Sequence, residues 1–126
     1  MNDLKDIANK ILGNGKGILA ADESNATMTK RLEAVNVESS MENRLKFRET
    51  LFTSESMKDC IGGVILYDET IKQKSNNKTI PELISKFDAF PGIKVDTGAK
   101  TLANSPEEKI TEGLDGLRER LKEYYK

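Results

Sequence analysis

The chain has 126 residues, a length that fits one domain and is too short for two ordinary hydrophobic cores. Its 20 Lys and Arg against 21 Asp and Glu give a net charge of −1, which argues against nucleic acid or an anionic membrane as partner. No apolar run approaches the roughly 18 residues of a membrane span, and the N-terminus is too polar for a signal peptide. We therefore expect a soluble, cytoplasmic protein.

The chain contains no histidine and a single cysteine, Cys60. These counts exclude Ser-His-Asp and Cys-His nucleophiles, histidine-ligated zinc and an internal disulfide. Any catalysis must use carboxylates, lysines or hydroxyls. We expect Cys60 to pack as a small hydrophobic side chain at the start of a strand.

The N-terminal third predicts a helix, a strand and a second helix. Residues 3–12 carry one apolar helical stripe, with Asn2 or Asp3 as N-cap. The run 17–21 has no polar alternation, which is typical of a strand covered on both faces. A short helix over 26–34 follows, capped by Ser24 or Asn25.

The middle of the chain predicts another helix, strand and helix. A capping box of Ser39 and Glu42 opens a helix over about 40–52, whose Met41, Leu45, Arg48 and Phe52 share one face. The apolar run 60–67 predicts a second buried strand. Polar residues 72–79 predict an exposed loop before a helix that opens at Pro81.

The last third predicts a third strand over 91–96, a long connection over 98–112 and a helix over 115–125. Strands alternating with helices favour right-handed βαβ crossovers and a parallel sheet, hence an α/β fold. Three strands are few for that architecture, because a parallel sheet needs both faces covered. The sequence therefore predicts only part of a larger parallel sheet.

Asp22 stands where the first strand ends, and barrel enzymes place their sites at the C-terminal ends of strands. The small Ala20 faces the same way and leaves room beside it. An equally simple interpretation is that Asp22 or Glu23 caps the next helix. Of the two, Glu23 is the better candidate for a cap or a salt bridge.

Lys94 interrupts an apolar strand, and an unpaired buried ammonium is costly. Asp96 lies two residues on and therefore on the same face, so it could pair with Lys94; Asp22 is the other candidate. The alternative is an edge strand with Lys94 in solvent. The flanking Ile93 and Val95 favour the buried, paired arrangement.

Thr27 and Arg31 lie four residues apart on one face of the helix after Asp22. A hydroxyl, a guanidinium and the free N–H groups of a helix N-terminus together suit a phosphate. Arg44 could reach the same place from the next helix. The competing interpretation, which is the more common fate of such residues, is a solvated polar face with an ion pair to Glu33 or Glu42.

Four blocks of the chain, in order, resemble class I fructose-bisphosphate aldolases. They are Gly15-Lys16-Gly17-Ile18-Leu19-Ala20-Ala21-Asp22-Glu23-Ser24, Cys60-Ile61-Gly62-Gly63-Val64-Ile65-Leu66-Tyr67-Asp68-Glu69-Thr70, Gly92-Ile93-Lys94-Val95-Asp96 and Glu112-Gly113-Leu114-Asp115-Gly116-Leu117. The resemblance implies that residues 1–126 form the N-terminal portion of a single (β/α)8 TIM barrel domain, with its first three strands and flanking helices.

The resemblance also implies an activity: metal-free, cofactor-free cleavage of fructose 1,6-bisphosphate through a lysine Schiff base. By motif, Asp22 matches a catalytic aspartate and Lys94 an active-site lysine that contacts substrate. Arg31 matches a phosphate-binding arginine and Thr27 its neighbouring serine, while Arg44 matches an arginine assigned to substrate binding. The sequence departs from the family at Asn25-Ala26 and at Thr97.

The Schiff-base lysine of the family is expected beyond Lys126, so we expect this chain to be inactive alone. The resemblance implies a sugar-phosphate substrate and a homo-oligomeric full-length protein. Two alternatives stay open: a non-catalytic phosphometabolite-binding or interaction module derived from the barrel, and a Schiff-base aldolase acting on another sugar phosphate.

Overall fold

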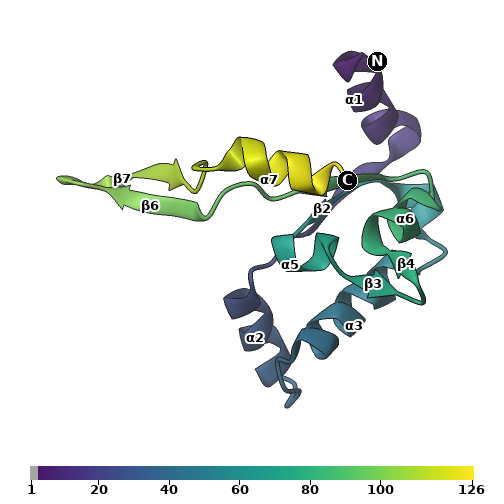
Figure 1. Cartoon of the computed structure of the whole chain (residues 1–126), viewed down its shortest axis with the longest axis horizontal. Helices are drawn as coiled ribbons and strands as arrows, with labels where there is room; N and C mark the ends of the chain where they lie inside the picture. Colours follow the sequence, from purple (N-terminus) through teal and green to yellow (C-terminus); the bar gives the residue numbers. More distant parts are fainter. Residues whose placement is uncertain (1–2) are drawn as a thin grey trace. The chain divides into compact units, whose positions relative to one another are not determined.

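The computed structural model describes residues 3–126, which fall into two compact units, one ending at Ile93 and one spanning Lys94–Lys126 (Figure 1). The first unit holds a parallel sheet with helices, and the second holds a hairpin and a helix. No helix among the described residues combines the length and apolar character that crossing a bilayer requires.

Three parallel strands form the sheet of the first unit, in the order β1 (Gly17–Ala21), β2 (Ile61–Leu66) and β5 (Phe90–Ile93). Ala21 pairs with Leu66, which pairs with Ile93, so the three strands end level with one another. The predicted parallel α/β arrangement is confirmed. The third strand is shorter than predicted and ends at Ile93, so Lys94 follows the strand.

The first three helices match their predicted positions: α1 (Leu4–Leu12), α2 (Asn25–Glu33) and α3 (Met41–Phe52). The side chains of Asp3 and Ser24 accept hydrogen bonds from the first turns of α1 and α2. Asn2 lies outside the described residues. The capping box at Ser39 is wrong, because Ser40 caps α3 and the Ser39 hydroxyl instead accepts from Thr29.

Short elements connect the strands. They are the 3-10 turn η1 (Gly13–Gly15), α4 (Met57–Cys60), α5 (Asp68–Ile71), β3 (Lys74–Ser75), β4 (Lys78–Thr79) and α6 (Ile80–Ser85). The expected loop over 72–79 is therefore a small hairpin, which turns through Asn76 and Asn77, both in the left-handed region that asparagine tolerates. Helix α6 begins at Ile80, one residue before the predicted start at Pro81, with Thr79 and Glu82 forming a reciprocal capping box.

The core of the first unit lies between β2 and the helices. Its fully buried members share apolar side chains: Ala21, Phe52, Met57, Val64, Leu66, Ile80, Ile84, Phe87 and Ala89. Two burial predictions are wrong. Strand β1 is not covered on both faces, because only Ala21 is buried and Ile18 is 52% exposed. Cys60 is also exposed, since it ends α4 before β2 begins.

The second unit consists of an antiparallel hairpin, β6 (Gly98–Leu102) with β7 (Ser105–Glu112), followed by α7 (Leu117–Tyr124) (Figure 1). The long connection expected over 98–112 is this hairpin, whose strands the sequence did not predict. The hairpin is almost entirely exposed, so its sequence lacks the apolar alternation that signals a strand with one buried face. Asn104, in the left-handed region, lies in its turn.

Candidate functional site

Asp22 directly follows Ala21, the buried last residue of β1, and is itself half-buried. It does not cap α2, because the Ser24 hydroxyl takes that role and accepts the Thr27 N–H at 3.4 Å. The capping interpretation of Asp22 and Glu23 is therefore wrong. Asp22 occupies the position that the sequence predicted, at the carboxyl edge of the sheet.

Glu23 pairs with two arginines. Its Oε1 accepts from Nη1 of Arg31 at 2.5 Å, and its Oε2 lies 4.0 Å from Nη2 of Arg48. Glu23 was the expected salt-bridge residue, and this is confirmed. The partner expected for Arg31 in a solvated ion pair was Glu33 or Glu42, and the structure places Glu23 there instead.

Arg48 is a residue whose importance the sequence reading missed. Its side chain is 0% exposed, and its Nη2 donates to the backbone carbonyl of Glu23. Burial lowers the pKa of its guanidinium, while the charges of Glu23 and Glu69 oppose that shift. A signal was present, because Arg48 shares the predicted apolar face of α3 with Phe52. A cation on a buried face needs such partners.

Arg44 and Glu69 form a two-pronged ion pair. Arg44 Nε donates to Glu69 Oε1 at 2.9 Å, and Nη2 donates to Oε2 at 2.6 Å. Nη1 of Arg44 donates to the Ser39 carbonyl at 2.5 Å. The Asn25 side-chain amide donates to the Glu69 carboxylate at 3.2 Å. Hydrogen bonding from Arg44 lowers the pKa of Glu69 and raises the pKa of Arg44. The guanidinium of Arg44 thus joins α3 to α5.

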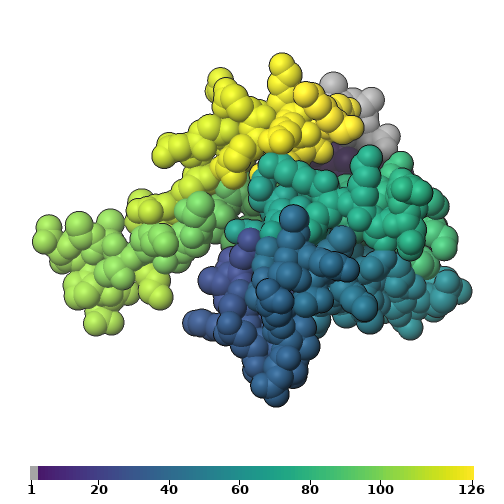
Figure 2. All heavy atoms as spheres, turned by 60° about the horizontal axis from the view of Figure 1, so that its bottom comes forward, coloured from purple at the N-terminus to yellow at the C-terminus, as the bar shows by residue number. Residues whose placement is uncertain are grey.

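Thr27 and Arg31 lie one turn apart on α2, and both side chains are exposed. The Thr27 hydroxyl is 3.2 Å from that of Ser24, and Arg31 is 54% exposed despite its pair with Glu23. Residues of α2 and α3, blue in Figure 2, form much of the surface in that view. The Thr27 hydroxyl and the Arg31 guanidinium are thus exposed to solvent on the same helix, α2.

In the second unit, Lys94 and Asp96 form the predicted pair. Lys94 Nζ is 3.1 Å from both Asp96 carboxylate oxygens, and Gly98 N–H donates to Oδ1 at 2.7 Å. The hydrogen bond from Lys94, followed by that from Gly98, lowers the pKa of Asp96. Each side chain is 28% exposed, so Lys94 is neither fully buried nor a solvent lysine.

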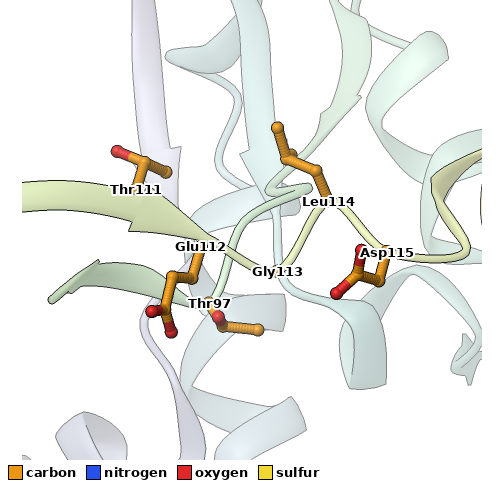
Figure 3. A pocket seen from close by; sticks show the side chains of 6 residues that line it. All are labelled: Thr97, Thr111, Glu112, Gly113, Leu114 and Asp115. Atoms are coloured by element: carbon orange, nitrogen blue, oxygen red, sulfur yellow. The ribbon is translucent and has the colours of Figure 1, made fainter.

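The base of the β6–β7 hairpin is closed by backbone contacts. Thr97 N–H donates to the Glu112 carbonyl at 2.9 Å, and a Cβ on Gly113 would come within 2.6 Å of Thr97 N. Gly113 also has a φ of +94°, which favours glycine. An open hollow of about 630 Å³ lies here, and Figure 3 shows Thr97 and Glu112 on one side of the ribbon with Thr111 on the other.

Helix α7 also contacts this base. Both terminal nitrogens of Arg120 donate to the Val95 carbonyl at 3.1 Å, and Nη2 donates to the Gly113 carbonyl at 2.5 Å. The Val95 carbonyl takes its hydrogen bonds from a side chain rather than from a neighbouring strand. No local pattern in the sequence predicts this contact.

Among the described residues, no group of three or more Asp, Glu or Cys side chains is arranged to hold a metal ion. Asp22 and Lys94 belong to different units, and their predicted convergence stays a prediction.

The sequence and the order of strands of this chain are similar to those of known proteins. The family model described as "Glycolytic: Fructose-bisphosphate aldolase class-I" matches residues 3–126. The chain belongs to the class I fructose-bisphosphate aldolase family. It corresponds to the N-terminal part of that family's sequence.

Individual aldolases support the assignment. Fructose-bisphosphate aldolase of Schistosoma mansoni is 49% identical over 99% of this chain and 35% of its own length. A probable class 1 aldolase of Xylella fastidiosa (strain Temecula1) is 46% identical over 100% of this chain and 38% of its own. The chain thus spans little more than a third of the aldolases it matches.

A solved structure agrees with the fold. The aldolase of Plasmodium falciparum, determined in complex with TRAP and a small-molecule inhibitor, superposes with a TM-score of 0.88 at 44% identity. The match covers 95% of this chain and 35% of that one.

Proposed function

We propose that this chain supplies the first three strands of a (β/α)8 barrel that catalyses reversible aldol cleavage of fructose 1,6-bisphosphate. The products are dihydroxyacetone phosphate and glyceraldehyde 3-phosphate, as in glycolysis and gluconeogenesis, and the reaction uses a lysine Schiff base. The observation that carries the proposal is the family match over residues 3–126, with Asp22 and Lys94 directly following β1 and β5 in the sequence. Both units then belong to one cytoplasmic barrel domain that assembles as a homo-oligomer.

In this proposal Asp22 and Lys94 act at the reacting carbons. A carboxylate at a strand end can take up and return the proton that moves during carbinolamine and imine chemistry. An ammonium that is held by Asp96 can stabilise developing negative charge on substrate oxygen. The imine itself forms on a lysine outside this chain, so the chain alone lacks the electron sink for carbon–carbon cleavage.

Thr27, Arg31 and Arg44 bind substrate in the proposal. Arg31 fits this role because its guanidinium is more than half exposed and lies one turn from the Thr27 hydroxyl. Arg44 already donates through all three of its nitrogens. A contact between Arg44 and substrate therefore requires it to share its donors with Glu69 or Ser39.

The test is fragment complementation. The 126-residue chain is co-expressed with the remaining two-thirds of the Schistosoma mansoni aldolase, and cleavage of fructose 1,6-bisphosphate is measured. We expect activity from the pair, none from either part alone, and loss of activity with Asp22→Asn or Lys94→Met.

Lys46→Ala, an exposed position on α3, is the matched control and keeps activity. A complex that assembles but does not cleave substrate contradicts the proposal. Phosphate binding without any cleavage favours the non-catalytic phosphometabolite module instead, and cleavage of a different sugar phosphate favours another Schiff-base aldolase.

A further inference from the structure

One guanidinium ties together the two ends of the β6–β7 hairpin. Arg120 Nη1 and Nη2 both donate to the carbonyl of Val95, which precedes the hairpin, and Nη2 donates to that of Gly113, which follows it. The planar fork of arginine can bind two carbonyls at once, whereas a lysine ammonium acts as a point charge. The backbone pair of Thr97 and Glu112 lies just inside this junction.

Val95 is the residue between Lys94 and Asp96. The peptide held by Arg120 is therefore the one that sets the spacing and direction of these two side chains. Asp96 is fixed at its other end as well, because Gly98 N–H donates to its Oδ1 at 2.7 Å. The Lys94 ammonium, 3.1 Å from both carboxylate oxygens, is thus aimed by a backbone that α7 anchors.

We infer that Arg120 is a positioning residue for the Lys94–Asp96 pair: it holds the Val95 peptide so that Asp96 presents the Lys94 ammonium in one orientation. The catalytic consequence rests on the proposed function, in which Lys94 contacts substrate. The positioning of Asp96 and Lys94 by Arg120 does not rest on the proposed function, because all three residues lie in the second unit. Misplacing a reacting group by about 1 Å can cost up to about 100-fold in rate.

The chain offers a matched comparison on the same helix. Arg118 is exposed, two residues before Arg120, and carries the same charge. Arg120→Lys keeps the charge but loses the planar fork, so it separates positioning from long-range electrostatics. Arg120→Ala removes both.

The first experiment follows the Asp96 carboxyl by NMR during a pH titration of the full 126-residue chain. In the unsubstituted chain, Lys94 and Gly98 hold the pKa of Asp96 below its ordinary range. We expect Arg120→Lys and Arg120→Ala to move the titration of Asp96 upward by similar amounts, because the pair loosens in both. Arg118→Lys leaves it unchanged.

An unchanged Asp96 titration in Arg120→Lys overturns the inference, since charge alone would then suffice. Circular dichroism melting is measured alongside. If both Arg120 variants lose the folded structure, the inference is also overturned, because Arg120 then serves overall stability rather than the pair.

The second experiment uses the complemented enzyme. We expect Arg120→Lys to lower kcat by about tenfold with little change in KM, because orientation rather than binding is lost. Arg118→Lys keeps both constants. Complementation that fails even for the unsubstituted chain contradicts the proposed function alone, and the NMR titration then still decides the role of Arg120.

Discussion

Arg44 and Glu69 are joined by two hydrogen bonds, of 2.9 Å and 2.6 Å, that link α3 to the short helix after β2. Asn25 at the start of α2 donates to the same carboxylate. Two helices that follow β1 and one that follows β2 therefore share one charged junction, which lies near the carboxyl edge of the sheet. Paired arginine and carboxylate groups of this geometry are among the stronger side-chain contacts.

Replacing Glu69 with Gln should lower stability at neutral pH by about 1 kcal/mol after solvent screening. The pKa of Glu69 is depressed in the folded chain, chiefly by its hydrogen bond to Arg44. Its contribution is therefore present above the ordinary pKa of a glutamate and is lost as pH falls through the folded value. Urea unfolding at neutral and acidic pH should show a smaller loss of stability on acidification in Glu69→Gln than in the unsubstituted chain.

Glu55→Gln is the control, because Glu55 is 78% exposed and its nearest lysine nitrogen is 3.8 Å away. Equal pH dependence of the Glu69→Gln and unsubstituted chains would contradict the role given to this junction.

Arg48→Ala should destabilise the first unit by about 3 kcal/mol, because it leaves a cavity and an unpaired Glu23 carbonyl. Arg48→Met fills most of the same volume and should cost clearly less, since buried ion pairs often add little over an apolar side chain. The measurement is the midpoint of urea unfolding, with exposed Lys46→Ala as control. Equal midpoints for the Ala and Met variants would refute the packing argument.

Arg31→Ala should raise the KM of the complemented enzyme for fructose 1,6-bisphosphate about tenfold, equivalent to about 1.4 kcal/mol of binding. Arg31→Lys should recover part of this loss, because a point charge replaces the fork. Steady-state kinetics measure both constants, and Lys58→Ala, at an exposed position of α4, serves as control. An unaltered KM in Arg31→Ala would remove Arg31 from the substrate site.

Cys60 should react fully with a maleimide under native conditions in the 126-residue chain. Its side chain is exposed at the end of α4, where the thiol donates to the Ser56 carbonyl at 3.0 Å. Mass spectrometry before and after addition of urea measures the reaction. Labelling that occurs only in urea would mean that the thiol is buried after all.

The sequence predicted the elements that carry an apolar run or an apolar helical stripe. The runs that became β1, β2 and β5 and the caps at Asp3 and Ser24 have clear local signals. The β6–β7 hairpin has none, because it is held by backbone pairing and by Arg120 rather than by an apolar face.

In the candidate site too, contacts within a few residues could be predicted and contacts between distant residues could not. The Lys94–Asp96 pair was predictable from two-residue spacing on one face. The contacts of Arg44 with Glu69 and of Arg48 with Glu23 join residues 25 positions apart. Such partners depend on how the helices pack, and a single sequence holds no local signal for that.

The level strand ends have a consequence for how this protein can change over time. Ala21 and Leu66 are buried partners in the sheet, whereas Asp22 and Tyr67 come one residue later, outside the hydrogen-bonded strands. In the proposed function Asp22 acts on substrate, so a substitution there changes reactivity, whereas Ala21 beside it belongs to the buried core. Selection can therefore act on reactivity and on folding through separate, adjacent positions.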